Sequence, residues 1–193
     1  MDLVLASSSP RRQELLRAAR IPFIVQASNV PEVIRAGEAP QDYCERLAFD
    51  KANAVWQNAN QKDIIVLGAD TTVVVGEHIL EKPQDPHDAL RMLRLLSGGS
   101  HVVITGVCLL GDGIHDVRSA STTVHVARLS DQELEDYVSS GEPMDKAGAY
   151  GIQGMFSRWI TRIDGEYPNV VGLPISLVYQ MLSSHGFFRG PKP

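Results

Sequence analysis

The chain has 193 residues, of which 44% are hydrophobic and 21% are charged, and its formal net charge is −5. This composition is typical of a globular protein with one substantial core. The acidic balance argues against non-specific binding to nucleic acid or to an anionic membrane, because both require a basic face. No apolar run reaches transmembrane length and no signal peptide precedes the first apolar segment, so we expect a cytoplasmic protein.

The first half of the sequence predicts strands and helices that follow one another closely. A helix is expected from Pro10 to about Ala19, and a second helix from Asp42 to about Asn58. The polar stretch 28–40, which contains two prolines, predicts a loop between these helices. Strands are expected at short apolar runs, namely 3–6, 23–25, 64–67, 72–75 and 79–80, and those at 3–6 and 64–67 are expected to be buried.

The second half predicts three more helices from their N-terminal caps, which are Asp85 with Pro86, the capping box of Ser130 and Glu133, and Pro174. The first of these helices is expected to bury Leu90, Leu93 and Leu96. Strands are expected at 102–110 and 117–126, joined in a hairpin, and at 158–163, with a frayed tail at 189–193. Because strands and helices do not alternate strictly, we predict an α/β fold with a mixed sheet.

The segment Ser7–Arg12 combines the end of a strand, a turn of small residues and the start of a helix. Ser9 is expected to cap this helix, and the N–H groups and dipole of a helix N-terminus favour phosphate. Arg11 and Arg12 add planar donors that are always charged and that grip phosphate through two hydrogen bonds. The alternative interpretation is a capped surface helix with two solvated arginines.

Asp70 follows the apolar run 64–67 within the segment Gly68–Thr72. We expect the strand to end there and the backbone to turn, which would put Asp70 in the crevice beyond the strand ends, where α/β proteins bind ligands. A carboxylate in that place is suited to hold Mg²⁺ or to accept a proton from an attacking water. The alternative is a turn aspartate that bonds its own backbone.

Three further charged residues, Glu32, Lys51 and Lys82, are candidates to complete this cluster, although each alone is more often a solvated surface charge. Gln153 lies in Gly148–Gly154, where glycine recurs at every third position. Its carboxamide offers a donor and an acceptor to the edge of a base, and the glycines allow close approach of the backbone to a flat ligand. The alternative interpretation of this segment is a flexible turn.

The common phosphate motifs, GxxxxGK[ST] and a helix-opening GxGxxG, do not occur. A strand-to-helix turn is expected at 169–174. The segments with distinctive motifs, in chain order, are Ser7–Arg12, Gly68–Thr72, Glu81–Pro83, Ser97–Gly98, Gly148–Gly154 and Val171–Pro174. Together they resemble the Maf family of nucleoside triphosphate pyrophosphatases. The resemblance implies a two-lobed α/β fold related to that of inosine triphosphatases, with helices flanking a mixed sheet and a nucleotide cleft between the lobes. On that interpretation residues 1–193 form a single nucleotide pyrophosphatase domain.

The resemblance also implies a reaction, the house-cleaning hydrolysis of a nucleoside triphosphate to monophosphate and pyrophosphate with a divalent cation, Mg²⁺ or Mn²⁺. By position, Asp70 matches the proposed base and a metal ligand, and Glu32 matches an acidic residue near the metal, with Glu38 of the same loop as its competitor. The polar residues around the phosphates are matched by Ser7, Arg12, Lys51 and Lys82. Sequence does not separate the two roles of Asp70.

Within this family, Arg11, Thr71 and Gln153 match the residues that mark the subgroup preferring dTTP and UTP. The resemblance makes a nucleoside triphosphate the partner, with no nucleic acid and no membrane, and it leaves a homodimer open. Two rival functions stay open at this point: a nucleotide-binding regulator of cell division without significant turnover, and a purine-directed triphosphatase. Pyrophosphate release from a panel of triphosphates would separate them.

Overall fold

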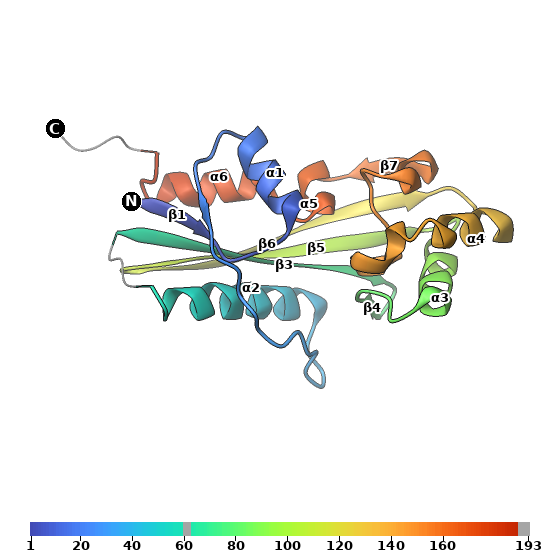
Figure 1. Cartoon of the computed structure of the whole chain (residues 1–193), viewed down its shortest axis with the longest axis horizontal. Coiled ribbons are helices and arrows are strands. Elements are labelled where there is room, and N and C mark those ends of the chain that lie inside the picture. Colours follow the sequence, from blue (N-terminus) through green and yellow to red (C-terminus); the bar gives the residue numbers. More distant parts are fainter. Residues whose placement is uncertain (60–62, 189–193) are drawn as a thin grey trace. The chain divides into compact units, whose positions relative to one another are not determined.

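The computed structural model describes residues 1–59 and 63–188, so the frayed tail expected at 189–193 lies outside the described residues (Figure 1). Among these residues seven strands form a mixed sheet in the order β2 (Ile24–Val25), β1 (Asp2–Leu5), β3 (Ile64–Val75), β5 (Ser100–Gly111), β6 (Ile114–Val126) and β7 (Ile160–Asp164), with β4 (His78–Leu80) paired to β3. The predicted α/β fold, a mixed sheet flanked by helices, is confirmed.

The chain folds into two compact units. The first unit consists of Met1–Asp70, Thr105–Ala120 and Gly172–Pro193, and the second of Thr71–Ile104 and Ser121–Val171. Strands β3, β5 and β6 contribute residues to both units. None of the helices in the described part of the chain is both long enough and apolar enough to cross a membrane.

In the first unit the sheet is covered on both faces. β1 pairs in parallel with β2 and β3. The helices of this unit are α1 (Pro10–Ala18), α2 (Pro40–Trp56) and α6 (Ile175–Ser184). Leu5 and Leu67 face a core closed by α1 and α6, whereas Val4 and Val66 face a core closed by α2 (Figure 1). Because successive side chains of a strand point to opposite faces, β1 and the first part of β3 are apolar throughout.

Helix α2 lies very close to the sheet at two glycines. A Cβ atom on Gly68 would stand 2.0 Å from the carbonyl oxygen of Ala48, and a Cβ atom on Gly106 would stand 2.3 Å from the carbonyl oxygen of Cys44. Any larger residue at either position would push α2 away from the sheet. The two glycines therefore set the height of α2, and with it the place of Lys51, above β3.

The expected turn at Asp70 is wrong. β3 runs without interruption from Ile64 to Val75, so the whole segment Gly68–Thr72 lies inside a strand. Gly68 is explained by the close approach of α2, and Ala69 belongs to the core on the opposite face. Asp70 is presented from the middle of a strand and is 7% exposed.

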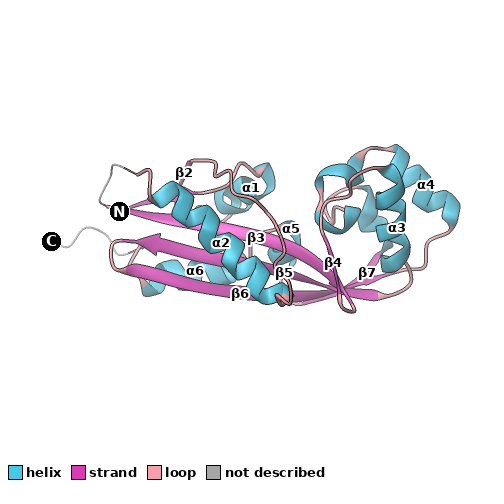
Figure 2. Cartoon of the chain, turned by 90° about the horizontal axis from the view of Figure 1, so that it is seen from below, coloured by secondary structure: helices cyan, strands magenta, loops and turns pink. Residues whose placement is uncertain are grey.

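The second unit carries the shorter elements. Its helices are α3 (Pro86–Leu96), α4 (Asp131–Ser139) and α5 (Tyr167–Val171), with 3₁₀ turns at Glu142–Asp145, Ala147–Ala149 and Met155–Trp159. α3 and α4 pack against each other (Figure 2).

β6 pairs in an antiparallel manner with β7, and β5 joins β6 through a tight turn at Asp112 and Gly113, which confirms the hairpin. Gly113 has a φ of +69°, a conformation that favours glycine in such a turn.

Of the side-chain caps that the sequence predicts, those of α3 and α4 are confirmed and that of α1 is not. The side chain of Asp85 accepts from the N–H of Asp88 at 2.8 Å. Ser130 and Glu133 form the complete capping box at the start of α4. Ser9 occupies the N-cap position of α1, but its side chain makes no capping hydrogen bond.

Two expectations for the second unit need correction. Leu90 is only half-buried, and the residues that α3 buries are Ala89, Met92, Leu93 and Leu96. The stretch 169–174 is not a strand-to-helix turn, because Asn169 lies in the short helix α5. Asn169 is fully buried, and its Nδ2 donates to the carbonyl oxygen of Val103 and to Oγ1 of Thr122, each at 3.0 Å.

Candidate active site

Lys51 of α2 holds two carboxylates together in the first unit. Its Nζ lies 2.6 Å from Oδ1 of Asp70 and 2.5 Å from Oε1 of Glu32. The side chains of Lys51 and Asp70 are nearly buried, at 11% and 9% exposure, whereas the Glu32 side chain is 43% exposed. The two carboxylates thus share one ammonium, and Arg12 supplies a second positive charge in their electrostatic field.

Glu38, the competing acidic residue of the same loop, is held elsewhere. Its two carboxylate oxygens accept hydrogen bonds from Nε and a terminal nitrogen of Arg46, at 2.5 and 2.7 Å. This bidentate bond to Arg46, together with the N–H of Arg35, lowers the pKa of Glu38 to about 2. The structure therefore brings Glu32, and not Glu38, to Lys51.

Arg12 of α1 is fixed at two of its nitrogens. Nε donates to the carbonyl oxygen of Gly172 at 2.8 Å, and a terminal nitrogen donates to Oγ of Ser7 at 3.2 Å. Oγ of Ser7, which is 8% exposed, also accepts the N–H of Ser9 at 3.2 Å. These bonds hold the guanidinium in one orientation at the N-terminus of α1, as a preorganised anion ligand requires.

The electrostatics link Arg12 to the carboxylates. Burial lowers the pKa of Arg12, and the positive charge of Arg11, which is half-buried on the same helix, lowers it further. The negative charges of Asp70 and Glu32 act in the opposite direction and raise the pKa of Arg12. The guanidinium keeps its proton at neutral pH. We call Ser7, Arg12, Glu32, Lys51 and Asp70 the Lys51 cluster. All five are among the predicted site residues, and they lie together in the first unit.

The carboxylates of the Lys51 cluster are suited to a metal ion that binds together with a polyphosphate. In residues 1–59 and 63–188 no group of three or more His, Cys, Asp or Glu side chains could hold a metal ion by itself. Glu32 and Asp70, however, converge on a single ammonium. Mg²⁺ binds through one or two carboxylates together with substrate phosphates, so this donor set suits a metal–polyphosphate complex and does not suit an all-protein metal cage.

Of the other predicted residues, Arg11 belongs to the first unit, whereas Thr71, Lys82 and Gln153 belong to the second. Thr71 is half-buried on β3, and Lys82 and Gln153 are exposed. The N–H of Gly148 donates to the carbonyl oxygen of Glu81 at 3.1 Å. This bond joins the turn that carries Gln153 to the segment that carries Lys82, so these two motifs of the sequence lie side by side.

The fold itself explains why position 148 is a glycine. Its φ is +69°, and a Cβ atom there would stand 2.9 Å from both methyl groups of Val73. The close backbone approach expected against a flat ligand is, at this glycine, an approach to Val73. The segment is not a loose turn either, because the 3₁₀ turns Ala147–Ala149 and Met155–Trp159 flank Gln153.

Sequence reasoning missed Tyr137 and Glu142, whose side chains bind the backbone of the turn that carries Gln153. Glu142 stands just ahead of the glycine-rich segment, which is the one signal that could have drawn attention to it. Tyr137 lies on α4 and gives no signal, because its partner Gly151 is 14 residues further along the chain.

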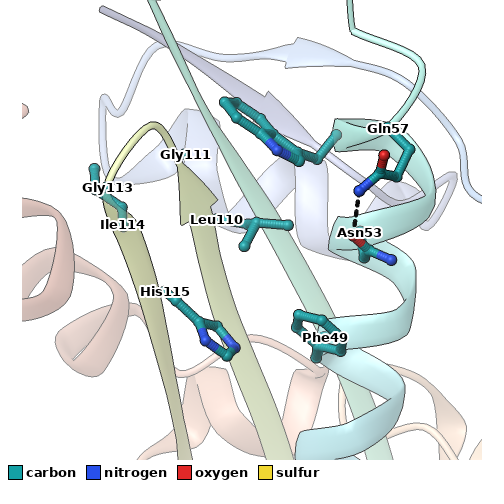
Figure 3. A pocket seen from close by; sticks show the side chains of 9 residues that line it. Phe49, Asn53, Gln57, Leu110, Gly111, Gly113, Ile114 and His115 are labelled. Carbon is teal, nitrogen blue, oxygen red and sulfur yellow. Dashed lines mark hydrogen bonds between the residues drawn. The ribbon is translucent and has the colours of Figure 1, made fainter.

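A pocket of about 410 Å³ lies between the second half of α2 and the β5–β6 turn (Figure 3). Its lining residues are Phe49, Asn53, Trp56, Gln57, Leu110, Gly111, Gly113, Ile114 and His115. None of them is a predicted site residue, and none is Lys, Arg, Asp or Glu. The pocket is therefore distinct from the Lys51 cluster and is not suited to bind a triphosphate.

Comparison with known proteins decides the family. Residues 2–185 match the family described as Maf-like protein. The chain belongs to the Maf family. The resemblance carried by its motifs is confirmed, and the match covers every residue of the Lys51 cluster.

Several curated relatives of this Maf chain are named dTTP/UTP pyrophosphatase. That of Koribacter versatilis is 58% identical over 186 residues, covering 96% of this chain and 95% of the relative. That of Symbiobacterium thermophilum is 50% identical, with the same coverage. That of Vibrio cholerae is 49% identical over 180 residues, covering 93% of this chain and 96% of the relative.

Among solved structures, this Maf chain is similar to the Ham1 protein of Staphylococcus aureus. The TM-score is 0.53 with 13% sequence identity, and the match covers 96% of this chain and 100% of that chain. At this identity the likeness shows the fold alone, and it agrees with the predicted α/β architecture.

Proposed function

We propose that this protein hydrolyses nucleoside triphosphates, with dTTP and UTP as its substrates, to nucleoside monophosphate and pyrophosphate. The single observation that carries the proposal is the Lys51 cluster, in which Lys51 holds Glu32 and Asp70 and Arg12 is fixed nearby in their electrostatic field. The 58% identity to a relative named dTTP/UTP pyrophosphatase supports the choice of substrate.

The basic groups bind and orient the phosphates. Phosphoryl and nucleotidyl transfer needs neutralisation of charge and positioning more than covalent help. Arg12, fixed by Gly172 and Ser7, offers a planar and permanently charged donor. Lys51 contributes an ammonium group, and Lys82 is assigned the same role by its match to the family motif. Ser7 keeps the guanidinium oriented while the substrate binds.

Asp70 orients the attacking water or takes its proton. Its carboxylate is nearly buried and bonded to Lys51 through Oδ1, which fixes the side chain in one orientation. A divalent cation, Mg²⁺ or Mn²⁺, held by Glu32 and Asp70 would neutralise charge on the substrate phosphates. Glu32 reaches this place from a solvent-exposed loop, so it can exchange its bond to Lys51 for one to the cation.

Base selection is assigned to Arg11, Thr71 and Gln153. Uracil and thymine present a carbonyl, an N–H and a second carbonyl along one edge, and a carboxamide can pair with two neighbouring groups of that pattern. Cytosine presents an amino group and a bare ring nitrogen there. Gln153 is exposed, so its carboxamide is accessible to a ligand.

In the cell, this activity would remove unwanted nucleotides from the pools used for synthesis. We propose that the protein does so in the cytoplasm, either as a monomer or as a homodimer, without binding nucleic acid or membrane. The net charge of −5 agrees with the absence of such anionic partners.

The test is a panel of dTTP, UTP, CTP, GTP and ATP with separate detection of pyrophosphate and orthophosphate. We expect pyrophosphate from dTTP and UTP above all, and loss of turnover when a chelator removes divalent cations. Preferred hydrolysis of GTP or ATP would favour the purine-directed alternative. Binding of nucleotides without pyrophosphate release would favour a regulator without turnover.

A further inference from the structure

The backbone on either side of Gln153 is anchored to a single pair of side chains. The N–H of Gly151 donates to Oη of Tyr137 at 3.2 Å, and the N–H of Met155 donates to Oε2 of Glu142 at 3.0 Å. Oη of Tyr137 in turn donates to Oε1 of Glu142 at 3.0 Å. Gln153 is thus the central residue of a short segment that is tied down two residues before it and two residues after it.

The pair that holds this segment is itself firmly placed. Tyr137 is fully buried, and its ring packs against Phe156 and Trp159 at centroid distances of 5.2 and 5.9 Å. Burial raises the pKa of Tyr137, so the hydroxyl keeps its proton and donates to Glu142. The carboxylate of Glu142 lies directly against the turn, because a Cβ atom on Gly154 would stand 2.2 Å from its Oε1.

We propose that Tyr137 and Glu142 are positioning residues that set base selectivity, because they hold the backbone that aims the carboxamide of Gln153. The proposal rests on the proposed function, in which Gln153 recognises the base. Gln153 is exposed and therefore has little packing of its own to fix it. Discrimination by hydrogen bonds requires a group held within about 0.5 Å of its productive place, and here the anchored backbone supplies that restraint.

The first variant is Tyr137→Phe, which keeps the ring in the aromatic cluster and removes only the hydroxyl. The ratio of kcat/KM for dTTP to that for CTP should fall about fivefold to tenfold, the loss expected for one buried hydrogen bond. The fall should come from a higher KM for dTTP, with kcat within about twofold of wild type, because the Lys51 cluster is unchanged.

A matched control is Trp159→Phe. Trp159 packs on the same ring of Tyr137, and its Nε1 donates to Oε1 of Glu133 at 3.1 Å, but neither contact involves the two anchoring hydrogen bonds. This variant should lower the melting temperature and leave the dTTP-to-CTP ratio at the wild-type value. A general loss of stability therefore does not imitate the expected change in selectivity.

Glu142 supplies an independent pair of variants. Glu142→Ala removes the acceptor for the N–H of Met155 and should lower the ratio as Tyr137→Phe does. Glu142→Gln keeps a carbonyl acceptor for that N–H and places an amide donor near Oη of Tyr137, so it should restore most of the selectivity. Equal loss in the Ala and Gln variants would contradict the anchoring role.

The decisive experiment repeats Tyr137→Phe in a Gln153→Ala background. If Tyr137 acts through Gln153, its substitution should cause no further fall in the ratio once the carboxamide is gone. An equal fall in both backgrounds, or no fall in either, would overturn the proposal. Turnover by wild type in the same assay distinguishes failure of the proposed function from failure of this proposal. If wild type releases no pyrophosphate, the proposed function is overturned. If wild type is active and the variants keep its selectivity, only the role of Tyr137 and Glu142 is overturned.

Discussion

Replacing Lys51 with Met should destabilise the protein by about 3 kcal/mol, because it leaves a buried carboxylate without its partner. Removal of one member of a buried ion pair costs about 3–5 kcal/mol. The Asp70 side chain is 9% exposed and loses an ammonium at 2.6 Å, whereas Glu32 is 43% exposed and can turn to water. Asp70 therefore accounts for most of the cost, which puts the total near the lower end of that range. Met keeps most of the aliphatic stem of Lys51, so the packing of α2 changes little.

The assay is urea-induced unfolding of wild type, Lys51→Met and the double variant Lys51→Met with Asp70→Asn. In the double variant the uncompensated charge is gone, so most of the lost free energy of unfolding should return. Lys51→Arg, which keeps a positive charge, serves as the control and should lose less than Lys51→Met. The reasoning is refuted if Lys51→Met unfolds at the wild-type urea concentration, or if Asp70→Asn restores nothing in its background.

Three further outcomes are expected. Arg12→Ala should lower kcat/KM for dTTP by about tenfold or more in initial-rate measurements. Arg12→Lys should recover only part of the lost kcat/KM, because an ammonium cannot bond both Gly172 and Ser7 as the planar guanidinium does. Gln153→Glu should lower kcat/KM for dTTP and UTP more than for CTP or GTP, since a carboxylate cannot donate to a base carbonyl; an equal fall for all four would remove Gln153 from base recognition. Burial lowers the pKa of His101 from 6.5 to about 4, so the unfolded chain takes up the proton first and stability falls as the pH drops below the unfolded pKa. Between about pH 7.5 and about pH 5 this should cost about 2 kcal/mol of unfolding free energy, and His101→Gln should lack that loss.

The elements that could be predicted are those whose signal is local. The apolar runs of β1 and the first part of β3 are recognisable because both faces of these strands are buried. The start of α4 is recognisable because Ser130 and Glu133 are three residues apart and satisfy each other. The family resemblance likewise rests on short segments in a fixed order.

The features that could not be predicted depend on contacts between distant parts of the chain. Gly68 and Asp70 are typical of a turn by local preference, yet β3 continues through them because Gly68 admits the backbone of α2. The choice of Glu32 over Glu38 depends on Arg46, whose guanidinium binds both carboxylate oxygens of Glu38. Asn169 finds its partner Val103 at a separation of 66 residues, which no local pattern indicates.

The most direct test of the account is the product of dTTP hydrolysis by wild type and by Asp70→Asn. Wild type should release pyrophosphate and dTMP in equal amounts, with no orthophosphate from the first cleavage. Asp70→Asn should remain folded and lose about two or more decades of that rate, because it removes the charge that a general base or a metal ligand needs. Pyrophosphate release at the wild-type rate by Asp70→Asn, or orthophosphate as the first product of the wild-type enzyme, would contradict the account.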